Sequence, residues 1–307
     1  MIRIPYKLVN GIMLIPVTAN DKDGFFAFDT GAMQTAVNKE YFPELHGEQI
    51  DIAKFSEGVK KSSADKGILN TLRFSDIELS DMPVLIMDLM YVETALKTLM
   101  PDLKMLGTLG IDVIGDHTVL LDYNAAEIVL DPEQGFEDQV TIPMRYENLP
   151  IIEVEAADKT CDFVLDTGAN TCLLGQSFQN DPQLTPVSEA PNIVTIPVVR
   201  VGGNEYKNIT AAISDISAIR KRVPVEGVIG YQILSPQRSV LDFKNGCLIM
   251  EKTPKDQTRH PKSRSRKRRA DTRQLLQAQG IGSFLWLAFR IASGFDVIDP
   301  NAATHIP

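Results

Sequence analysis

Short hydrophobic runs, many of them alternating with polar residues, recur along residues 4–252. Runs of this kind, bounded by Gly, Pro, Asn and Asp, are typical of β-strands. The clearest are IMLIPVTA (12–19), GFFAFD (24–29), HTVLLDY (117–123), EIVLD (127–131), DFVLD (162–166), TIPVVRV (195–201), SVLDF (239–243) and CLIME (247–251). Between the last two, Asn245-Gly246 is a strong signal for a two-residue hairpin. The pattern predicts an all-β protein with a few short helices.

Helical signals are few and short in this region. Two similar segments, IDVIGD (111–116) and YQILSP (231–236), each follow a glycine and each predict one short helix. A third helix is expected between Thr94 and Leu106.

The hydrophobic pattern of residues 15–32 occurs a second time at 152–169. Aligned without gaps, ten of the eighteen positions are identical, including Asp-Thr-Gly-Ala at the end of each. Two further pairs of segments match in the same order, 72–88 with 199–215 and 107–130 with 227–250. Three matched segments in one order indicate an internal duplication rather than a chance repeat of turns.

The duplication divides the chain into three parts. We expect an N-terminal half at 1–140, a C-terminal half at 141–252, and a separate segment at 253–307. The first half is longer by insertions of about ten and seven residues between the matched segments, and added length is tolerated best in surface loops.

Charge differs sharply between the body and the tail of this 307-residue chain, which is 44% hydrophobic and 23% charged. From Lys252 onward 11 Lys/Arg stand against 4 Asp/Glu, a balance of +7, whereas residues 1–251 have a balance of −16. An acidic body argues against nucleic acid as the main partner, because phosphate binding needs a basic surface.

Cysteine and histidine content adds no metal site or disulfide framework. The three cysteines are odd in number and lack metal-ligand spacing, and the four histidines are scattered. The first residues lack the pattern of a signal peptide. We therefore expect a cytoplasmic protein, without a metal or an organic cofactor.

The two Asp-Thr-Gly segments each place a carboxylate at the end of an apolar strand. Asp29 follows FFAF and Asp166 follows DFVL, each on a turn whose glycine allows close backbone approach. If the two halves pack about a pseudo-twofold axis, the carboxylates meet and share one proton, because two adjacent carboxylates do not both ionise easily. One can then act as a base toward water while the other acts as an acid. The hydroxyls of Thr30 and Thr167 could bond across and hold the pair.

This arrangement resembles the retropepsin-like aspartic peptidases of the bacterial and retroviral type, with two such repeats in one chain. A strand, then Asp-Thr-Gly-Ala, then a later apolar-apolar-Gly segment with a short helix is the family's pattern, and it covers roughly residues 4–252. The resemblance implies a bilobal pepsin/retropepsin-like acid protease fold. It also implies an aspartic endopeptidase acting on peptides or proteins, with Asp29 and Asp166 as the catalytic pair.

The resemblance assigns further positions around this pair. Those supporting the catalytic loops are Thr30, Gly31, Ala32, Thr167, Gly168 and Ala169. Those packing beneath the loops are Leu109, Gly110, Ile229 and Gly230. Candidates for a covering flap are residues 52–70 and 184–198. Phe55 is the only aromatic residue in either flap candidate, so no tyrosine marks a pepsin-like flap.

Several alternatives stay open. A peptidase-like scaffold without activity could bind peptides or partners, since a fold does not guarantee its chemistry. We expect a monomer with a pseudo-dimeric body, and a homodimer that pairs equivalent loops between chains is the alternative. Asp122 and Asp242 also recur, and we interpret them as turn or ion-pair residues. Cys172 is near one loop but lacks an evident base, which argues against a thiol nucleophile.

The C-terminal part has a different composition. Residues 252–273 hold ten Lys/Arg and predict a disordered linker. Residues 280–298 have apolar residues at helical spacing, and this run is too short to span a bilayer. We expect a helix that docks on the body or on a partner. Attachment to an anionic membrane surface is the second interpretation, and a tail without a role in the enzyme is the third.

Overall fold

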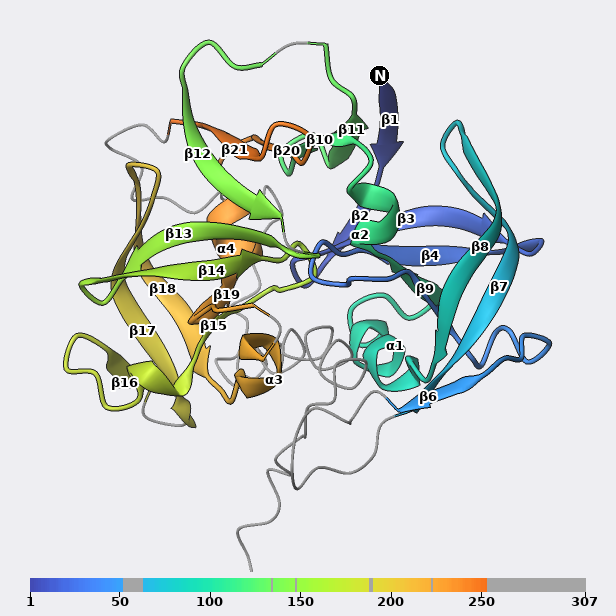
Figure 1. The fold of residues 1–307 in the computed structure, drawn as a ribbon, viewed down its shortest axis with the longest axis horizontal. Coiled ribbons are helices and arrows are strands. Elements are labelled where there is room, and N and C mark those ends of the chain that lie inside the picture. Colours follow the sequence, from blue (N-terminus) through green and yellow to red (C-terminus); the bar gives the residue numbers. More distant parts are fainter. Residues whose placement is uncertain (52–62, 134, 147, 188–189, 222, 253–307) are drawn as a thin grey trace, which may run out of the picture.

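The computed structural model describes residues 1–51, 63–133, 135–146, 148–187, 190–221 and 223–252. It is bilobal and built mainly of strands, as predicted (Figure 1). An eight-stranded sheet forms one lobe. A thirteen-stranded sheet begins at the N-terminus, crosses between the lobes and continues into the other lobe.

The elements of residues 2–130 are β1 (Ile2–Pro5), β2 (Lys7–Val9), β3 (Ile12–Ala19), β4 (Lys22–Phe28), β5 (Ala36–Asn38), β6 (Gln49–Asp51), β7 (Ser63–Phe74), β8 (Ile77–Met87), α1 (Met90–Lys97), β9 (Met105–Leu109), α2 (Ile111–Ile114), β10 (Thr118–Asp122) and β11 (Glu127–Leu130).

The elements of residues 139–251 are β12 (Gln139–Tyr146), β13 (Pro150–Ala156), β14 (Lys159–Leu165), β15 (Cys172–Leu174), the 3₁₀ turn η1 (Gln176–Phe178), β16 (Thr185–Val187), β17 (Ala190–Val201), β18 (Asn204–Ile213), α3 (Ser217–Arg220), β19 (Gly227–Ile229), α4 (Tyr231–Leu234), β20 (Ser239–Asp242) and β21 (Cys247–Glu251).

The two lobes have the same strand order. In one lobe it is β3-β4-β9-β5-β8-β7, and in the other it is β13-β14-β19-β15-β18-β17. In each, the strand that ends at the Asp-Thr-Gly segment pairs in parallel with a later strand, β4 with β9 and β14 with β19. That later strand ends in an apolar residue followed by glycine, so the apolar-Gly segment lies directly beside the start of each Asp-Thr-Gly loop.

The lobes are joined by a layer of strands from both parts of the chain. Strand β10 pairs antiparallel with β20, and β11 and β21 extend the layer on either side. The β20–β21 turn contains Asn245-Gly246, and Gly246 has φ of +64°. The prediction of a two-residue hairpin was wrong, because the last strand pair is Asp242 with Cys247 and the connection has four residues, 243–246. Asp122 and Asp242 accept backbone N–H groups within their hairpin turns, which agrees with the predicted turn role.

The short helices α2 and α4 begin where they were predicted, but the third helix does not. It was expected between Thr94 and Leu106, whereas α1 begins at Met90 and ends at Lys97. The backbone N–H of Met90 donates to Asp88 Oδ1 at 3.1 Å, which starts the helix earlier than expected. Pro101 and β9, which begins at Met105, leave no room for a helix to Leu106.

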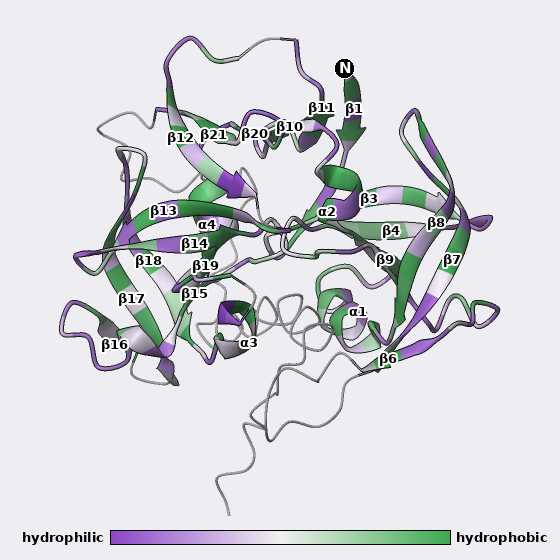
Figure 2. Cartoon of the chain, viewed as in Figure 1, coloured by the Kyte–Doolittle hydropathy of each residue, from purple (hydrophilic) through white to green (hydrophobic). Residues whose placement is uncertain are grey.

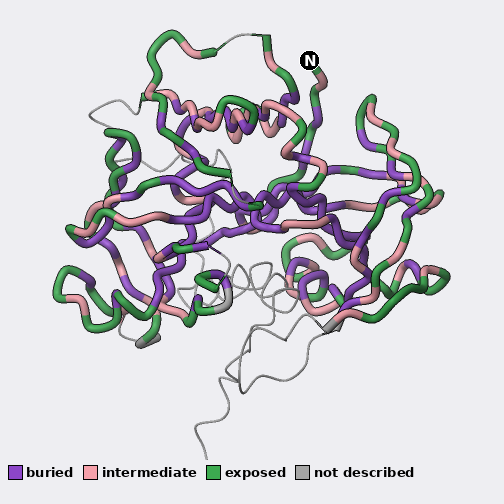
Figure 3. The backbone as a smooth tube through the Cα atoms, viewed as in Figure 1, coloured by how far each residue is buried: buried purple, intermediate pink, exposed green. Residues whose placement is uncertain are grey.

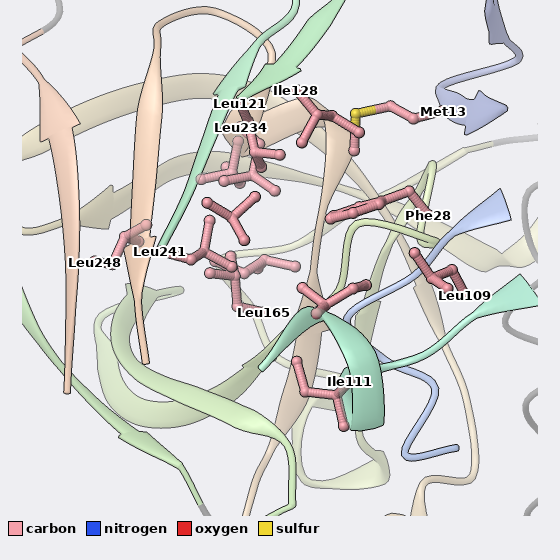
Figure 4. Close-up of a cluster of buried hydrophobic side chains, with 14 of the residues drawn as sticks. Met13, Phe28, Leu109, Ile111, Leu121, Ile128, Leu165, Leu234, Leu241 and Leu248 are labelled. Atoms are coloured by element: carbon pink, nitrogen blue, oxygen red, sulfur yellow. The ribbon is translucent and has the colours of Figure 1, made fainter. Parts of the chain in front are cut away.

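Hydrophobic side chains fill each lobe and continue across the boundary between them. Green segments run through the strands toward the centre (Figure 2), and the central chain segments are the most buried (Figure 3). In Figure 4, Phe28 and Leu109 from one lobe lie in the same cluster as Leu165, Leu234 and Leu241 from the other. This shared core fixes the two lobes relative to one another beneath the Asp-Thr-Gly loops.

Candidate active site

The two Asp-Thr-Gly loops (residues 29–32 and 166–169) meet between the lobes. Strand β4 ends at Phe28 and β14 ends at Leu165, and the segments that follow them run side by side through the buried centre of Figure 3. Asp29 and Asp166 are each only 3% exposed. The structure thus brings together the two carboxylates that lie 137 positions apart in the sequence.

Each threonine of the loops binds the opposite strand end through two hydrogen bonds. Thr30 Oγ1 donates to the Leu165 carbonyl at 2.7 Å and accepts the Thr167 N–H at 3.1 Å. Reciprocally, Thr167 Oγ1 donates to the Phe28 carbonyl at 2.8 Å and accepts the Thr30 N–H at 3.0 Å. Both threonines are fully buried. Four reciprocal bonds between buried groups hold the loops in one relative position.

Each loop glycine faces the carboxyl group of the opposite loop. A Cβ built on Gly31 would lie 2.4 Å from Asp166 Cγ, and one on Gly168 would lie 2.5 Å from Asp29 Cγ. A real side chain cannot approach so closely. Both positions therefore require glycine, because only a residue without a side chain leaves room for the carboxyl of the opposite loop.

The carboxyl groups also receive hydrogen bonds from their own loops. The Gly31 N–H donates to Asp29 Oδ1 at 2.8 Å, and the Gly168 N–H donates to Asp166 Oδ1 at 2.7 Å. These two bonds orient the carboxyls through their Oδ1 atoms, and the Oδ2 atoms take no part in them.

Burial dominates the ionisation of the pair. It raises the pKa of Asp29 above the ordinary value, although the hydrogen bond with Asp166 acts in the opposite direction. Burial raises the pKa of Asp166 well above the ordinary value, and the charge of Asp29 and their shared hydrogen bond raise it further. The pair therefore keeps one proton at pH values where an exposed aspartate has lost it. An acid and a base then lie side by side.

The apolar-Gly segments support the loops from below, where the resemblance placed them. Leu109 accepts the Asp29 N–H through its carbonyl at 3.1 Å, and Ile229 accepts the Asp166 N–H at 2.8 Å. A Cβ on Gly110 would lie 2.6 Å from the backbone of Gln34. This contact excludes any side chain there.

The alanines of the loops connect to the short helices. The Ala32 carbonyl accepts the Ile111 N–H at 2.7 Å, and the Ala169 carbonyl accepts the Tyr231 N–H at 2.9 Å. A Cβ on Gly230 would lie 2.2 Å from the Ala169 carbonyl oxygen. Helices α2 and α4 thus begin against the loops.

Two supporting residues, Thr35 and Asp112, were not found from the sequence. Thr35 Oγ1 donates to Asp112 Oδ1 at 2.8 Å and accepts the Gly110 N–H at 3.1 Å. In the other half, Cys172 occupies the position that corresponds to Thr35, and the Gly230 N–H donates to its thiol. Aligning the two repeats past each loop places Thr35 opposite Cys172, and this was the signal that could have found Thr35.

The Cys172 thiol is buried, and burial raises its pKa to about 12. A thiol that remains protonated at neutral pH is a poor nucleophile, which agrees with the argument from the sequence against a thiol nucleophile at Cys172.

The remaining predictions concern residues away from the loops. Parts of both flap candidates and all of residues 253–307 lie outside the described residues. Among the described residues, no group of three or more His, Cys, Asp or Glu could hold a metal ion. No helix of this described part is long and apolar enough to cross a membrane.

A separate hollow of about 530 Å³ lies on the N-terminal lobe. Its charged lining residues are Asp23, Arg73, Asp102 and Lys104, and it includes no residue of the Asp-Thr-Gly loops. It is therefore distinct from the carboxyl pair.

Comparison with solved structures defines the class of the fold. The aspartic proteinase from Irpex lacteus matches with a TM-score of 0.54 and 8% sequence identity, over 82% of this chain and 97% of that chain. At this identity the likeness concerns the fold alone. The protein has an aspartic proteinase fold.

Sequence comparison matches about a third of the chain to a known family. The model of the family described as "Aspartyl protease" matches residues 15–113, which include the Asp29 loop and the Gly110 segment. No match was found among the curated proteins. The two matches confirm the resemblance to the aspartic peptidases.

Proposed function

We propose that the protein is an aspartic endopeptidase in which Asp29 and Asp166 together activate a water molecule. The observation that carries this proposal is the meeting of two carboxyls, each only 3% exposed, whose pKa values burial raises. The aspartyl protease family match supports hydrolysis of peptide bonds in general, and the carboxyl pair supports this particular mechanism.

The chemistry follows from one proton on two carboxyls. The ionised carboxylate takes a proton from water as the water oxygen attacks the peptide carbonyl carbon, while the protonated carboxyl gives its proton to the carbonyl oxygen. When the tetrahedral intermediate collapses, the C–N bond breaks and the leaving nitrogen takes a proton from the protonated carboxyl. One hydroxyl of the intermediate gives its proton to the ionised carboxylate as its C=O bond forms. The products are a carboxylic acid and an amine, and the pair again holds one proton.

The threonine bonds serve this chemistry by keeping the carboxyls in place. A displacement of about 1 Å in a reacting group costs on the order of 100-fold in rate. Because Thr30 and Thr167 bond across the two halves of one chain, we take a single chain as the catalytic unit. One measurement of molecular size beside an activity titration distinguishes it from a homodimer.

Substitution of either aspartate tests the proposal. Asp29→Asn and Asp166→Asn keep the shape of the carboxyl but cannot ionise, and each should abolish cleavage of an unfolded protein substrate. Asp242→Asn, at a hairpin turn, is the matched control and should retain activity. Turnover by either loop variant, with contaminating proteases excluded, would disprove the mechanism.

The non-catalytic scaffold predicts a different result. It would show no cleavage and no pepstatin-sensitive activity at any pH, while binding of a peptide would survive both loop substitutions.

A further inference from the structure

The hollow of about 530 Å³ on the N-terminal lobe lies over one face of the β3–β4 pair. In these strands Pro16 lies opposite Phe25 and Thr18 lies opposite Asp23, so the four side chains share that face. All four line the hollow, and none of them is buried. Two residues before Pro16, Leu14 on the same face packs into the hydrophobic cluster that includes α1. The hollow thus begins where this face is no longer covered.

The corresponding face of the C-terminal lobe carries ion pairs between its own residues. Arg145 pairs with Asp162 at 2.9 Å, and Arg200 pairs with Glu155. Arg145 lies on β12 beside β13, and Arg200 lies opposite Glu155 where β17 crosses β13. Each cation of this face therefore has a carboxylate supplied by the chain itself.

The N-terminal lobe keeps the two cations and lacks the two carboxylates. Strand register puts Lys7 and Arg73 in the places where the other lobe has its two arginines. The offset of 137 between the repeats puts Phe25 in place of the first carboxylate and Thr18 in place of the second. Lys7 Nζ accordingly lies over the Phe25 ring, 4.8 Å from its centroid. An apolar floor has replaced one acid, and a neutral hydroxyl has replaced the other.

The remaining charges of the hollow leave its cations available. Arg73 pairs with Asp21 at 3.3 Å, but the Asp21 side chain is 92% exposed, and such pairs contribute little. Lys104 also lines the hollow and forms no ion pair within the described part of the chain. Asp23 and Asp102 lie among these cations, and Asp23 accepts a hydroxyl of the lining at 2.7 Å. Interspersed acids disfavour a polyanion and favour a ligand whose carboxylates are placed at the cations.

We propose that this hollow binds a peptide segment of another protein in which acidic residues flank one large apolar side chain. The apolar side chain covers Pro16 and Phe25, and the carboxylates meet the three cations, as the chain's own acids do in the other lobe. The size of the hollow is within the range of ligand sites. The tail of this chain has the wrong charge for it, with 11 Lys/Arg against 4 Asp/Glu from Lys252 onward. Because no residue of the Asp-Thr-Gly loops lines the hollow, the proposal does not depend on the proposed function.

A series of capped pentapeptides tests the chemistry of the ligand. The probe has one Phe between two Glu on each side, and it is titrated calorimetrically into the full-length protein and into Asp29→Asn, so that cleavage does not obscure binding. We expect it to bind at least about tenfold more tightly than the peptides with Gln or Lys in place of Glu. Replacing its Phe by Ala should weaken binding by about tenfold. Added salt should weaken binding of the acidic probe, because the cations are at the surface.

Variants of the lining then locate the bound peptide. Thr18→Glu recreates the carboxylate of the other lobe beside Arg73 and should weaken binding of the acidic probe by about fivefold. Lys104→Gln removes one cation and should weaken it by about threefold to fivefold. Lys207→Gln changes an exposed lysine of the C-terminal lobe and is the matched control, with no change expected. Thermal unfolding of each variant identifies one that fails to fold.

Several outcomes would overturn this proposal. One is an acidic probe that binds no more tightly than the Gln and Lys peptides, or does not bind at millimolar concentration, and the wild-type protein decides this even if no variant folds. Another is an unchanged affinity in folded Thr18→Glu and Lys104→Gln, because the peptide then binds elsewhere. A dimer of the full chain that dissociates in Thr18→Glu would assign the hollow to a second copy instead. Failure of the wild-type protein to cleave any peptide, with binding of the probe intact, contradicts the proposed function alone.

Discussion

Gly31 lies directly against the carboxyl group of Asp166, so closely that a methyl carbon on Gly31 would be 2.4 Å from Asp166 Cγ. The reciprocal contact joins Gly168 and Asp29 at 2.5 Å. The glycines of the Asp-Thr-Gly loops are thus part of the surface that the opposite carboxyl packs on. Each of these contacts joins one half of the chain to the other. Either half alone would therefore leave its aspartate without the opposite glycine.

Gly31→Ala should therefore remove activity. The methyl group must push the Asp166 carboxyl or the whole loop away, and a shift of about 1 Å costs on the order of 100-fold in kcat/KM. Gly135→Ala is the control, because the nearest atom there is the end of the flexible Gln139 side chain at 3.1 Å. Kinetics of both variants on one peptide give the comparison. Equal activities of the two variants would show that the Asp-Thr-Gly loops can shift to accommodate the added methyl group without loss of activity.

The threonine bonds should contribute both to stability and to activity. Thr167→Val keeps the shape of the side chain but loses the hydroxyl, which leaves the Phe28 carbonyl and the Thr30 N–H unpaired in a buried site. We expect the free energy of unfolding to fall by about 2–5 kcal/mol. Thr167→Ser retains the hydroxyl and should lose much less. Denaturant unfolding measures both, and equal losses for Val and Ser would contradict the assigned bonds.

The raised pKa of Asp166 predicts how stability depends on pH. In the unfolded chain an aspartate ionises near pH ~4. In the folded protein it holds its proton to a higher pH. As pH rises from about 4 through the folded pKa, the unfolded state therefore releases its proton first, and the folded state loses stability.

Asp166→Asn removes this loss because the amide does not ionise. The free energy of unfolding of the variant, relative to the wild-type protein, should rise between about pH 3 and pH 7, with a slope of at most about 1.4 kcal/mol per pH unit for one proton. The pH dependence is the informative quantity, because the substitution also changes hydrogen bonds at every pH. Parallel stability curves would argue against a raised pKa.

Much of the fold could be predicted because it depends on local patterns. Residues 12–19 form a short apolar run of strand length, and β3 has those bounds. The repeat at 152–169 placed Asp166 in the same local structure as Asp29 before any contact between them was known. The repeat made it possible to predict that Asp29 and Asp166 meet, because two similar halves are expected to pack against each other through equivalent faces.

Other features depend on tertiary contacts and left no local pattern. The bond from Thr35 to Asp112 joins residues 77 positions apart, and nothing in the sequence near either residue indicates it. The end of α1 was misplaced because helix propensity continues beyond Lys97, whereas the chain must turn to begin β9 at Met105.

The last prediction concerns Glu93 on α1. This helix lies in the second of the two insertions that make the first half longer. It is fully buried, accepts the Tyr41 hydroxyl at 2.7 Å and the Met105 N–H at 3.0 Å, and forms an ion pair with Lys97. Glu93→Leu would leave these donors unpaired and the lysine charge unmatched, at a cost of about 3–5 kcal/mol in the free energy of unfolding.

An exposed ion pair provides the control for Glu93. Glu44 pairs with Lys22 while its side chain is 47% exposed, so Glu44→Ala should cost about 0–1 kcal/mol. Denaturant unfolding of both variants measures the difference. Because Met105 begins the strand that leads to Leu109, and the Leu109 carbonyl binds the Asp29 N–H, Glu93→Leu should also lower kcat/KM at temperatures where the variant is still folded. A stable and fully active Glu93→Leu would show that α1 is not needed to position β9.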